Sequence, residues 1–261
     1  MAIKDIAVVT GGASGIGRST TETLAARNIE VIAIDLNAEL LAELENRDRI
    51  HPHQGDVASN DTWAEVVARA QSDLGSAPNL FVANAAQVIV GTTLELSDDD
   101  WHTLFETNLM GVVRGARALL PGMINSGKGA MVLLGSTDAF MAEQGLAAYC
   151  ATKGAILQFS RVLAVDHARQ GIRVNCVCPG VTDTPLFRYH LSKADNPDAV
   201  LAARTERIPL GRLNSPEDIA RTVAFLLSDD AAGITGALVP VDAGLSTSFE
   251  FRSGAEWGDM T

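Results

Sequence analysis

Residues 6–17 read IAVVTGGASGIG, a short apolar run that leads directly into a turn rich in glycine. The β-branched residues 6–10 predict a buried strand, and the segment from Ser14 onward predicts a helix. A glycine-rich turn between a strand and a helix is typical of a fold that binds a dinucleotide. By itself the pattern is a weak signal, so the alternative of a loop that only connects two elements stays open.

Each glycine of this turn has a separate expected task. Gly11 can take a positive φ in the tight turn, Gly15 lets the backbone approach a pyrophosphate, and Gly17 lets the helix pack close to the sheet. The N-terminus of that helix then presents free N–H groups and a partial positive charge to the anion. We therefore expect the cofactor to bind here.

Asp35 follows the next predicted strand, residues 30–34, about twenty residues beyond the turn. A carboxylate at this place accepts hydrogen bonds from a ribose 2′-hydroxyl and repels a 2′-phosphate, which favours NAD over NADP. Arg18 is near enough in the sequence to leave NADP as an alternative, and Asp35 could instead cap the following helix.

The rest of the chain alternates apolar strand-like runs with helical stretches. The runs lie near Val8, Val31, Ile50, Leu80, Val132, Val174 and Val239, and the helical stretches at residues 61–74, 101–124, 147–169 and 216–227. This βαβ repetition predicts an α/β chain with a single-domain Rossmann fold: a doubly wound, seven-stranded parallel sheet with helices on both faces. Ligands of such sheets bind beyond the carboxyl ends of the strands.

The formal net charge of −12 in 261 residues opposes binding to nucleic acid or to an anionic membrane. No apolar run is long enough to span a bilayer and no leader pattern precedes the first strand, so we expect a cytoplasmic protein. His51 and His53 flank Pro52, but a third ligand at a useful spacing is missing, and we expect no metal site. A small-molecule substrate fits this composition better than a macromolecule.

Tyr149 and Lys153 lie four residues apart in a predicted helix, which puts both side chains on one face. A tyrosine with its ordinary pKa near 10 is almost fully protonated at neutral pH, and an ammonium group about 4 Å away stabilises the phenolate by roughly 4 kcal/mol. We expect Lys153 to lower the pKa of Tyr149, and Tyr149 to act as general base in alcohol oxidation and as general acid in carbonyl reduction.

Together these motifs resemble the short-chain dehydrogenase/reductase family, from the first strand to about residue 245. The matching elements are the glycine turn at residues 10–17, Asp56-Val57, Asn84-Ala85-Ala86, Asn108, Ser136, Tyr149, Lys153, and Pro179-Gly180 with Thr184. Ala86 and Ala243 depart from the pattern, since relatives commonly have glycine there.

The resemblance implies a role for each matching residue. Asp56 and Val57 would contact adenine, while Val181 and Thr184 would contact the nicotinamide carboxamide or a nearby phosphate. Ser136 would hold the substrate oxygen. The implied catalytic residues are Asn108, Ser136, Tyr149 and Lys153, with Lys153 also binding the nicotinamide ribose and Asn108 holding a water of a proton relay. The implied cofactor-binding residues are Gly11, Ser14, Gly15, Ile16, Gly17, Asp35, Asp56, Val57, Asn84, Ala85, Tyr149, Lys153, Pro179, Gly180, Val181 and Thr184.

The expected function is therefore hydride transfer between NAD(H) and a secondary alcohol or ketone. A non-catalytic dinucleotide sensor and a lyase or dehalogenase on the same scaffold are the alternatives. The resemblance also implies a homotetramer.

The sequence does not identify the substrate, but it suggests which residues surround it. Residues that could line the substrate pocket are Gln87, Val88, Phe140, Met141 and Gln144. Residues 1–245 form the expected catalytic domain, with a substrate lid at 184–212. A tail follows at 246–261, whose aromatic residues Phe249, Phe251 and Trp257 would pack against a neighbouring subunit.

Overall fold

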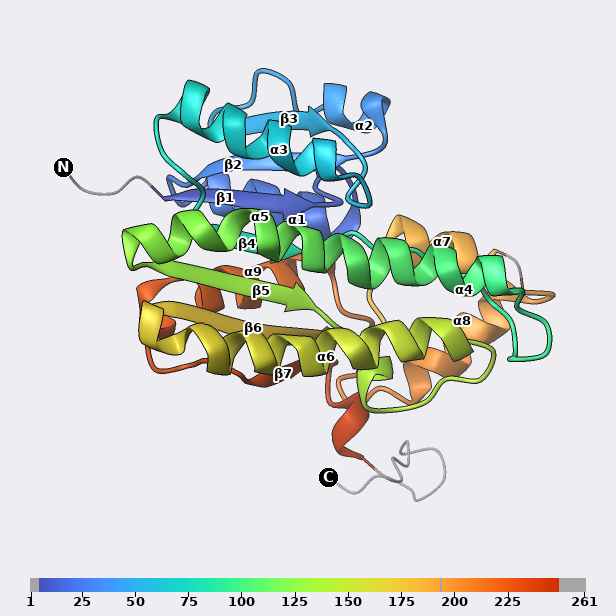
Figure 1. The fold of residues 1–261 in the computed structure, drawn as a ribbon. Coiled ribbons are helices and arrows are strands. Elements are labelled where there is room, and N and C mark those ends of the chain that lie inside the picture. Colours follow the sequence, from blue (N-terminus) through green and yellow to red (C-terminus); the bar gives the residue numbers. More distant parts are fainter. Residues whose placement is uncertain (1–4, 193, 249–261) are drawn as a thin grey trace.

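The computed structural model describes residues 5–192 and 194–248, which form one α/β unit around a seven-stranded parallel sheet (Figure 1). The strand order is β3-β2-β1-β4-β5-β6-β7, so the chain winds outward in both directions from β1 and β4. The strands are β1 Ile6–Thr10, β2 Glu30–Asp35, β3 Ile50–Gln54, β4 Leu80–Ala83, β5 Gly129–Leu134, β6 Ile172–Pro179 and β7 Leu238–Val241. The predicted single-domain, doubly wound fold is confirmed.

Helices connect the strands on both faces of the sheet. They are α1 Gly15–Ala25, α2 Ala38–Ala42, α3 Asn60–Arg69, α4 Asp98–Phe105, α5 Gly111–Ser126, α6 Ala147–His167, α7 Pro185–Leu191, α8 Pro197–Glu206 and α9 Pro216–Leu227. Two π-helical segments, η1 Ala70–Leu74 and η2 Glu106–Met110, prolong α3 and join α4 to α5. Short 3₁₀ turns include η3 Thr137–Ala139, between β5 and α6.

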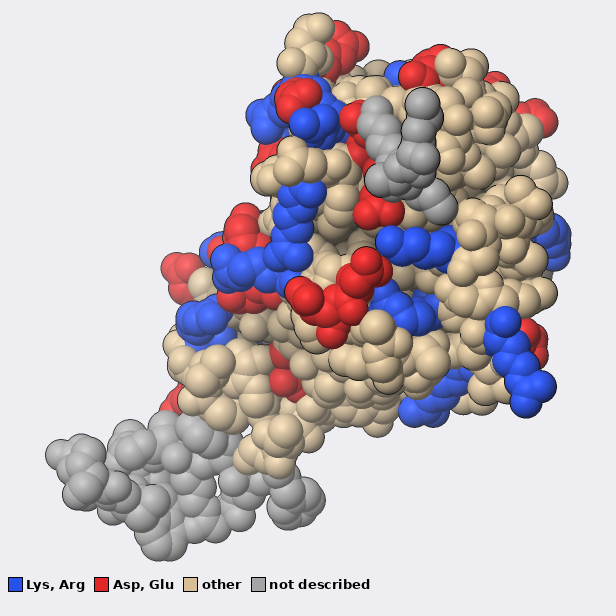
Figure 2. All heavy atoms as spheres, turned by 90° about the vertical axis from the view of Figure 1, so that its left-hand side faces the viewer, with Lys and Arg blue, Asp and Glu red and all other residues tan. Residues whose placement is uncertain are grey.

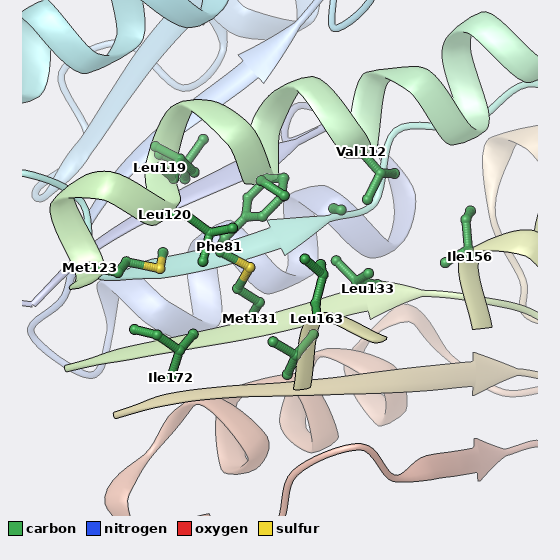
Figure 3. Packing of buried hydrophobic residues seen from close by; sticks show 14 of the residues in the cluster. Phe81, Val112, Leu119, Leu120, Met123, Met131, Leu133, Ile156, Leu163 and Ile172 are labelled. Carbon is green, nitrogen blue, oxygen red and sulfur yellow. The ribbon is translucent and has the colours of Figure 1, made fainter. Parts of the chain in front are cut away.

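The alternation of side chains along the strands divides the core into two layers. In β4, Phe81 points toward α3, α5 and α6, whereas Leu80 and Val82 point toward α1 and α9. Figure 3 shows the first layer, in which Phe81 lies among side chains of α5, α6 and neighbouring strands. Burial of apolar side chains on both faces explains why β1, β4 and β5 read as continuous apolar runs.

Helices α7 and α8, for which the sequence predicted no bounds, lie beyond the carboxyl ends of the strands (Figure 1). Within the part of the chain that the structure describes, no helix combines the length and apolar character that crossing a bilayer requires. Most of the expected tail, including Phe249, Phe251 and Trp257, lies outside the described residues.

The two edge strands each contain a proline, Pro52 in β3 and Pro240 in β7. The carbonyl oxygen of Pro52 accepts a hydrogen bond of 2.6 Å from Nη1 of Arg69, at the end of α3. Figure 2 shows the face at the amino ends of the strands, where acidic and basic side chains are interspersed. The ligand-binding features described next lie at the opposite ends of the strands.

Candidate active site

A cavity of about 820 Å³ lies beyond the carboxyl ends of the strands and is covered by α7 and α8. Most of the residues implied as catalytic or cofactor-binding line it together: Gly11, Ser14, Gly15, Ile16, Asn84, Ala85, Ser136, Tyr149, Lys153, Pro179, Gly180, Val181 and Thr184. The other five, which do not line it, are Gly17, Asp35, Asp56, Val57 and Asn108.

The glycine turn has the backbone shape that a bound phosphate needs. Gly11 and Gly15 have φ values of +61° and +50°, in the left-handed region that favours glycine. A Cβ on Gly17 would lie 1.9 Å from the carbonyl oxygen of Gly11, so only glycine fits there. Among the described residues, Ser14 makes no side-chain capping bond to α1, which leaves the N–H groups of this helix terminus available to an anion.

Asn84 and Thr10 fix the turn to the end of β4. The hydroxyl of Thr10 accepts hydrogen bonds from the backbone N–H groups of Asn84 and Ala85, at 2.9 and 3.0 Å. The side-chain amide of Asn84 donates to the carbonyl oxygens of Thr10 and Gly11, at 2.9 and 3.3 Å. Asn84 therefore holds the shape of the turn with its side chain.

Asp35 ends β2, and both of its carboxylate oxygens accept backbone hydrogen bonds. Oδ2 accepts from the N–H of Ala13 at 3.1 Å, which ties the carboxylate to the glycine turn, and Oδ1 accepts from Asn37 at 3.0 Å. The following helix α2 is capped by the side chain of Asn37, not by Asp35. The carboxylate of Asp35 therefore lies beside the glycine turn, against which a dinucleotide would bind.

Arg18 is the cation that kept NADP as an alternative cofactor, and its guanidinium is bound to two carboxylates. Its guanidinium donates to Glu43 at 2.6 Å and to Glu22 at 3.2 Å. These two carboxylates balance its charge, and their hydrogen bonds raise the pKa of Arg18 further. A 2′-phosphate would have to compete with both of them for this side chain.

Asp56 and Val57 lie in the turn after β3. Oδ1 of Asp56 accepts the N–H of Ala58 at 2.8 Å, and the carbonyl of Val57 accepts the indole N–H of Trp63 at 2.9 Å. The Val57 side chain is buried against Gly111 of α5. The adenine contacts implied for this pair stay a prediction.

Helix α6 presents Tyr149 and Lys153 on one face, toward the cavity. Nζ of Lys153 lies 5.6 Å from the centre of the Tyr149 ring and donates a hydrogen bond of 2.8 Å to the carbonyl oxygen of Leu134, the last residue of β5. Lys153 is only 3% exposed, and this burial lowers its pKa to about 8. The ammonium group therefore loses its proton much more readily than that of an exposed lysine.

The protonation of Tyr149 differs from the expectation. Burial, followed by the nearby carboxylate of Asp138, raises the pKa of Tyr149, while a hydrogen bond with Ser136 acts in the opposite sense. The prediction that Lys153 lowers this pKa is therefore wrong for the chain by itself. Its ammonium group bonds to the Leu134 carbonyl, and desolvation of the phenolate has the larger effect.

Ser136 lies directly between β5 and η3. Its hydroxyl accepts the N–H of Asp138 at 3.1 Å and donates to Oδ2 of the same residue at 3.1 Å. Ser136 is therefore both the cap of η3 and a group that faces Tyr149. Asp138 was missed by the sequence analysis, because its position depends on how η3 packs against α6.

Asn108 lies inside the π-helical segment η2 and is fully buried. Its side-chain oxygen accepts the N–H of Gln87 at 2.7 Å, and its amide nitrogen donates to the Gln87 carbonyl at 2.9 Å and to the Thr152 hydroxyl at 3.2 Å. These bonds connect the loop after β4 to α6, next to Lys153. The implied role in holding a water stays a prediction, and it would fall to the backbone of Asn108 because the side chain is engaged.

The residues after β6 join the sheet to the covering helices. Thr184 caps α7 by accepting the N–H of Phe187 at 3.2 Å. A Cβ on Gly180 would lie 2.7 Å from the side chain of Asp242, so the backbone segments meet closely here. Ala243, one of the two departures from the family pattern, has a φ of +55°, where glycine is favoured; Ala86, the other, lines the cavity.

The expected lid corresponds to α7, α8 and the chain up to α9. Its side of the cavity includes Phe187 and His190 of α7 and Arg204 of α8. Arg204 donates a hydrogen bond of 2.5 Å to Glu143, in the loop before α6, so an ion pair joins the lid to the body of the protein. Sequence analysis did not foresee this pair.

Some of the residues suggested for the substrate pocket are found there. Val88 and Gln144 line the main cavity, and Met141 lines an adjoining cavity of about 170 Å³. Gln87 and Phe140 line neither of the two.

Comparison with known proteins gives consistent matches along most of the chain. A family model described as enoyl-(acyl carrier protein) reductase matches residues 11–246. The chain is 34% identical over 247 residues to 2-(S)-hydroxypropyl-CoM dehydrogenase 3 of Xanthobacter autotrophicus, covering 93% of this chain and 96% of that protein. It is 32% identical over 247 residues to 2,5-dichloro-2,5-cyclohexadiene-1,4-diol dehydrogenase LinX of Sphingobium indicum, covering 92% and 96%. Its structure is similar to ligand-free aldohexose dehydrogenase of Thermoplasma acidophilum, with a TM-score of 0.87, 26% identity, and 96% and 97% of the two chains covered.

Proposed function

Because the chain belongs to the short-chain dehydrogenase/reductase family of oxidoreductases, we propose that it transfers a hydride between NAD(H) and a secondary alcohol or ketone. The observation that carries this proposal is the meeting of two sets of residues in one cavity. The glycine turn, with Gly11 and Gly15, lines one part of it, and Ser136, Tyr149 and Lys153 line another. A cofactor and a reacting alcohol could therefore lie side by side.

The residues of the chain fit a nicotinamide dinucleotide. The uncapped N-terminus of α1 and the left-handed Gly11 and Gly15 suit a pyrophosphate. The engagement of Arg18 by two carboxylates, together with the carboxylate of Asp35 beside the turn, supports NAD over NADP. When bound, the nicotinamide supplies the acceptor or donor of the hydride.

Residues of the chain would transfer the proton of the substrate hydroxyl group. The phenolate oxygen of Tyr149 takes the proton from the substrate alcohol during oxidation, and the protonated phenol gives it to the ketone oxygen during reduction. On substrate binding, the Ser136 hydroxyl would turn its single proton from Asp138 to the same oxygen and stabilise the negative charge that develops on it. Lys153, whose pKa of about 8 lies near neutrality, assists by its positive charge when protonated.

The raised pKa of Tyr149 makes it harder for this residue to act as the base in alcohol oxidation. Because burial and Asp138 oppose ionisation, the phenol needs positive charge beyond that of Lys153 to act as a base near neutral pH. We therefore expect oxidation to be favoured at alkaline pH, whereas reduction, which uses the protonated phenol, needs no such help.

Replacement of Tyr149 by phenylalanine tests the proposal. Without the hydroxyl, kcat should fall by at least about 100-fold, while binding of NADH, followed by its fluorescence, is kept. Tyr189→Phe is the matched control, because Tyr189 is the other tyrosine of the chain and does not line the cavity. Retained turnover in Tyr149→Phe would remove this residue from the mechanism. Binding of NADH without turnover of any alcohol or ketone by the wild type would favour a dinucleotide sensor.

The proposal includes assembly into a homotetramer. Helix α6 exposes two apolar side chains on its outer face, Val162 at 46% and Val165 at 80%. Exposed apolar side chains on one helix face are typical of a surface that a partner covers. Multi-angle light scattering measures the mass directly, and a monomer at working concentration would contradict this part of the proposal.

A further inference from the structure

The carboxylate of Asp138 belongs to the lining of the cavity. Asp138 lies in η3, two residues after Ser136, and lines both the main cavity and the adjoining cavity of about 170 Å³. Its electrostatic effect on Tyr149 and its hydrogen bond with Ser136 put it beside both groups that would hold the substrate oxygen. A substrate bound there must therefore present some part of itself to Asp138.

Asp138 has no cation as a direct partner in residues 5–192 and 194–248. The two basic groups that act on it electrostatically are engaged elsewhere, because Arg204 binds Glu143 at 2.5 Å and Lys153 donates to the Leu134 carbonyl at 2.8 Å. Within the same residues, Oδ2 accepts the Ser136 hydroxyl, whereas Oδ1 accepts no hydrogen bond. One oxygen of a half-buried carboxylate is thus left to a donor from outside the chain.

The position of Asp138 is energetically unfavourable when no substrate is bound. A carboxylate removed from water without a cationic partner is unfavourable, and burial together with Glu143 raises the pKa of Asp138 accordingly. Its charge also opposes ionisation of Tyr149. A hydrogen-bond donor on the substrate would offset both effects, because it stabilises the carboxylate and reduces the negative potential at the phenol.

We propose that Asp138 binds a second hydroxyl group of the substrate, on the carbon next to the reacting one, so that the enzyme selects vicinal diols and α-hydroxyketones over simple alcohols and ketones. This inference rests on the proposed function, since it places the reacting oxygen at Ser136 and Tyr149. The Ser136 hydroxyl and Oδ2 of Asp138 are 3.1 Å apart, so groups bound to the two residues are neighbours. Substituents on adjacent carbons can meet this requirement.

A hydroxyl group fits better than an ammonium group as the second substituent. Lys153 and Arg204 already place two cationic side chains around the cavity, and both act on Asp138 electrostatically. Arg204 is paired with Glu143, but an ammonium group at Asp138 would still be repelled by Lys153, whereas a hydroxyl group is neutral. A hydroxyl can also bond to Asp138 in either protonation state, because it both donates and accepts.

The test compares acetoin with butanone, which differ only in the hydroxyl next to the carbonyl group, as substrates of the wild type, Asp138→Ala and Asp138→Asn. The wild type should prefer acetoin in kcat/KM, and Asp138→Ala should lower the acetoin-to-butanone ratio by about 10-fold or more, the effect of losing a hydrogen bond to a charged group. Asp138→Asn keeps an acceptor oxygen and should lie between the two. Asp99→Ala, which removes an exposed carboxylate that lines neither cavity, should leave the ratio as in the wild type.

Several outcomes would overturn the inference. Equal kcat/KM for the two ketones in the wild type, or an unchanged ratio in Asp138→Ala, would show that Asp138 only supports the loop. A wild type that oxidises the vicinal amino alcohol of cyclohexane better than the vicinal diol would assign Asp138 to an ammonium group instead.

Binding separates this inference from the proposed function. Where neither ketone is turned over, calorimetric titration of the enzyme–NADH complex with each ketone decides on Asp138 independently of the proposed function. Tighter binding of acetoin that is lost in Asp138→Ala would support its role, and equal binding of acetoin and butanone would exclude it.

Discussion

The side-chain amide of Asn108 pairs with the backbone of Gln87 through two hydrogen bonds, of 2.7 and 2.9 Å. An amide side chain can do this because it carries a donor and an acceptor, like the peptide group that it faces. A third bond, to Thr152, joins the pair to the helix that bears Tyr149 and Lys153. Asn108 therefore holds three separate segments of the site together.

Asn108→Ala should lower the free energy of unfolding by about 2–4 kcal/mol, since it removes three hydrogen bonds and leaves the Gln87 backbone groups unpaired. Asn196→Ala is the control: it removes the cap of the exposed helix α8 and should cost about 1 kcal/mol. Urea unfolding of both variants gives the comparison. A loss no larger than that of the control would show that the Gln87 pairing contributes little.

Asp35→Asn should reduce the preference for NAD, measured as the ratio of kcat/KM for NAD to that for NADP, by about 10-fold or more. Asparagine keeps an acceptor for the Ala13 N–H but no longer repels a 2′-phosphate. Glu39→Gln removes one negative charge from the exposed face of neighbouring α2 and should leave the ratio unchanged. A wild type that prefers NADP would refute the role given to Asp35.

Lys153→Met should change how stability depends on pH. The pKa of Lys153 is about 8 in the folded chain, against an ordinary value of 10.5, so between these values the unfolded chain binds more protons than the folded one. Lys153 therefore makes the free energy of unfolding rise with pH in this window, by up to about 1.4 kcal/mol per unit. Below about pH 8 the group is charged in both states and contributes no slope.

The measurement is urea unfolding of the wild type and Lys153→Met at about pH 7.5, 8.5 and 9.5. The difference in unfolding free energy, wild type minus variant, should increase across this series by about 1–2 kcal/mol. A constant difference would mean that Lys153 is not depressed in pKa. The subtraction removes the contribution of all other titrating groups that the substitution does not affect.

Gly17→Ala should destabilise the fold by about 2 kcal/mol or more and weaken NADH binding, because its Cβ would overlap the Gly11 carbonyl and approach Nδ2 of Asn84 to 2.6 Å. Gly154→Ala in α6 is the matched control, since the nearest atom to its Cβ, the Ala139 carbonyl oxygen, lies 3.6 Å away. That control should be neutral or stabilising by up to about 1 kcal/mol. Equal thermal stability of the two variants would show that the turn can relax.

The central strands were predicted well from the sequence because β1, β4 and β5 are buried on both faces and are therefore continuous apolar runs. Helix α9 was predicted with its observed bounds, Pro216–Leu227, since Ser215 and Pro216 mark its start. The starts of α7 and α8 carry the same kind of signal, Thr184-Pro185 and Asn196-Pro197, which could have revealed both helices.

Other features had no signal in the sequence. The π-helical turn around Asn108 depends on how α4 and α5 pack, and the position of Asp138 depends on contacts between η3 and α6. The protonation of Tyr149 was predicted in the wrong direction because spacing along a helix shows which groups are near, and does not show how deeply they are buried. The sequence identified most residues of the site, but it did not predict the direction in which the pKa of Tyr149 is shifted.

The proline in β3 has a consequence for the behaviour of the protein at high concentration. Pro52 has no N–H to donate, and the guanidinium of Arg69 already occupies its carbonyl oxygen. A strand from another molecule would find neither backbone group free at this position, so it could not extend the sheet in register past β3. This border is therefore protected against the edge-to-edge stacking that leads to aggregates, and copies of the chain must associate through other surfaces.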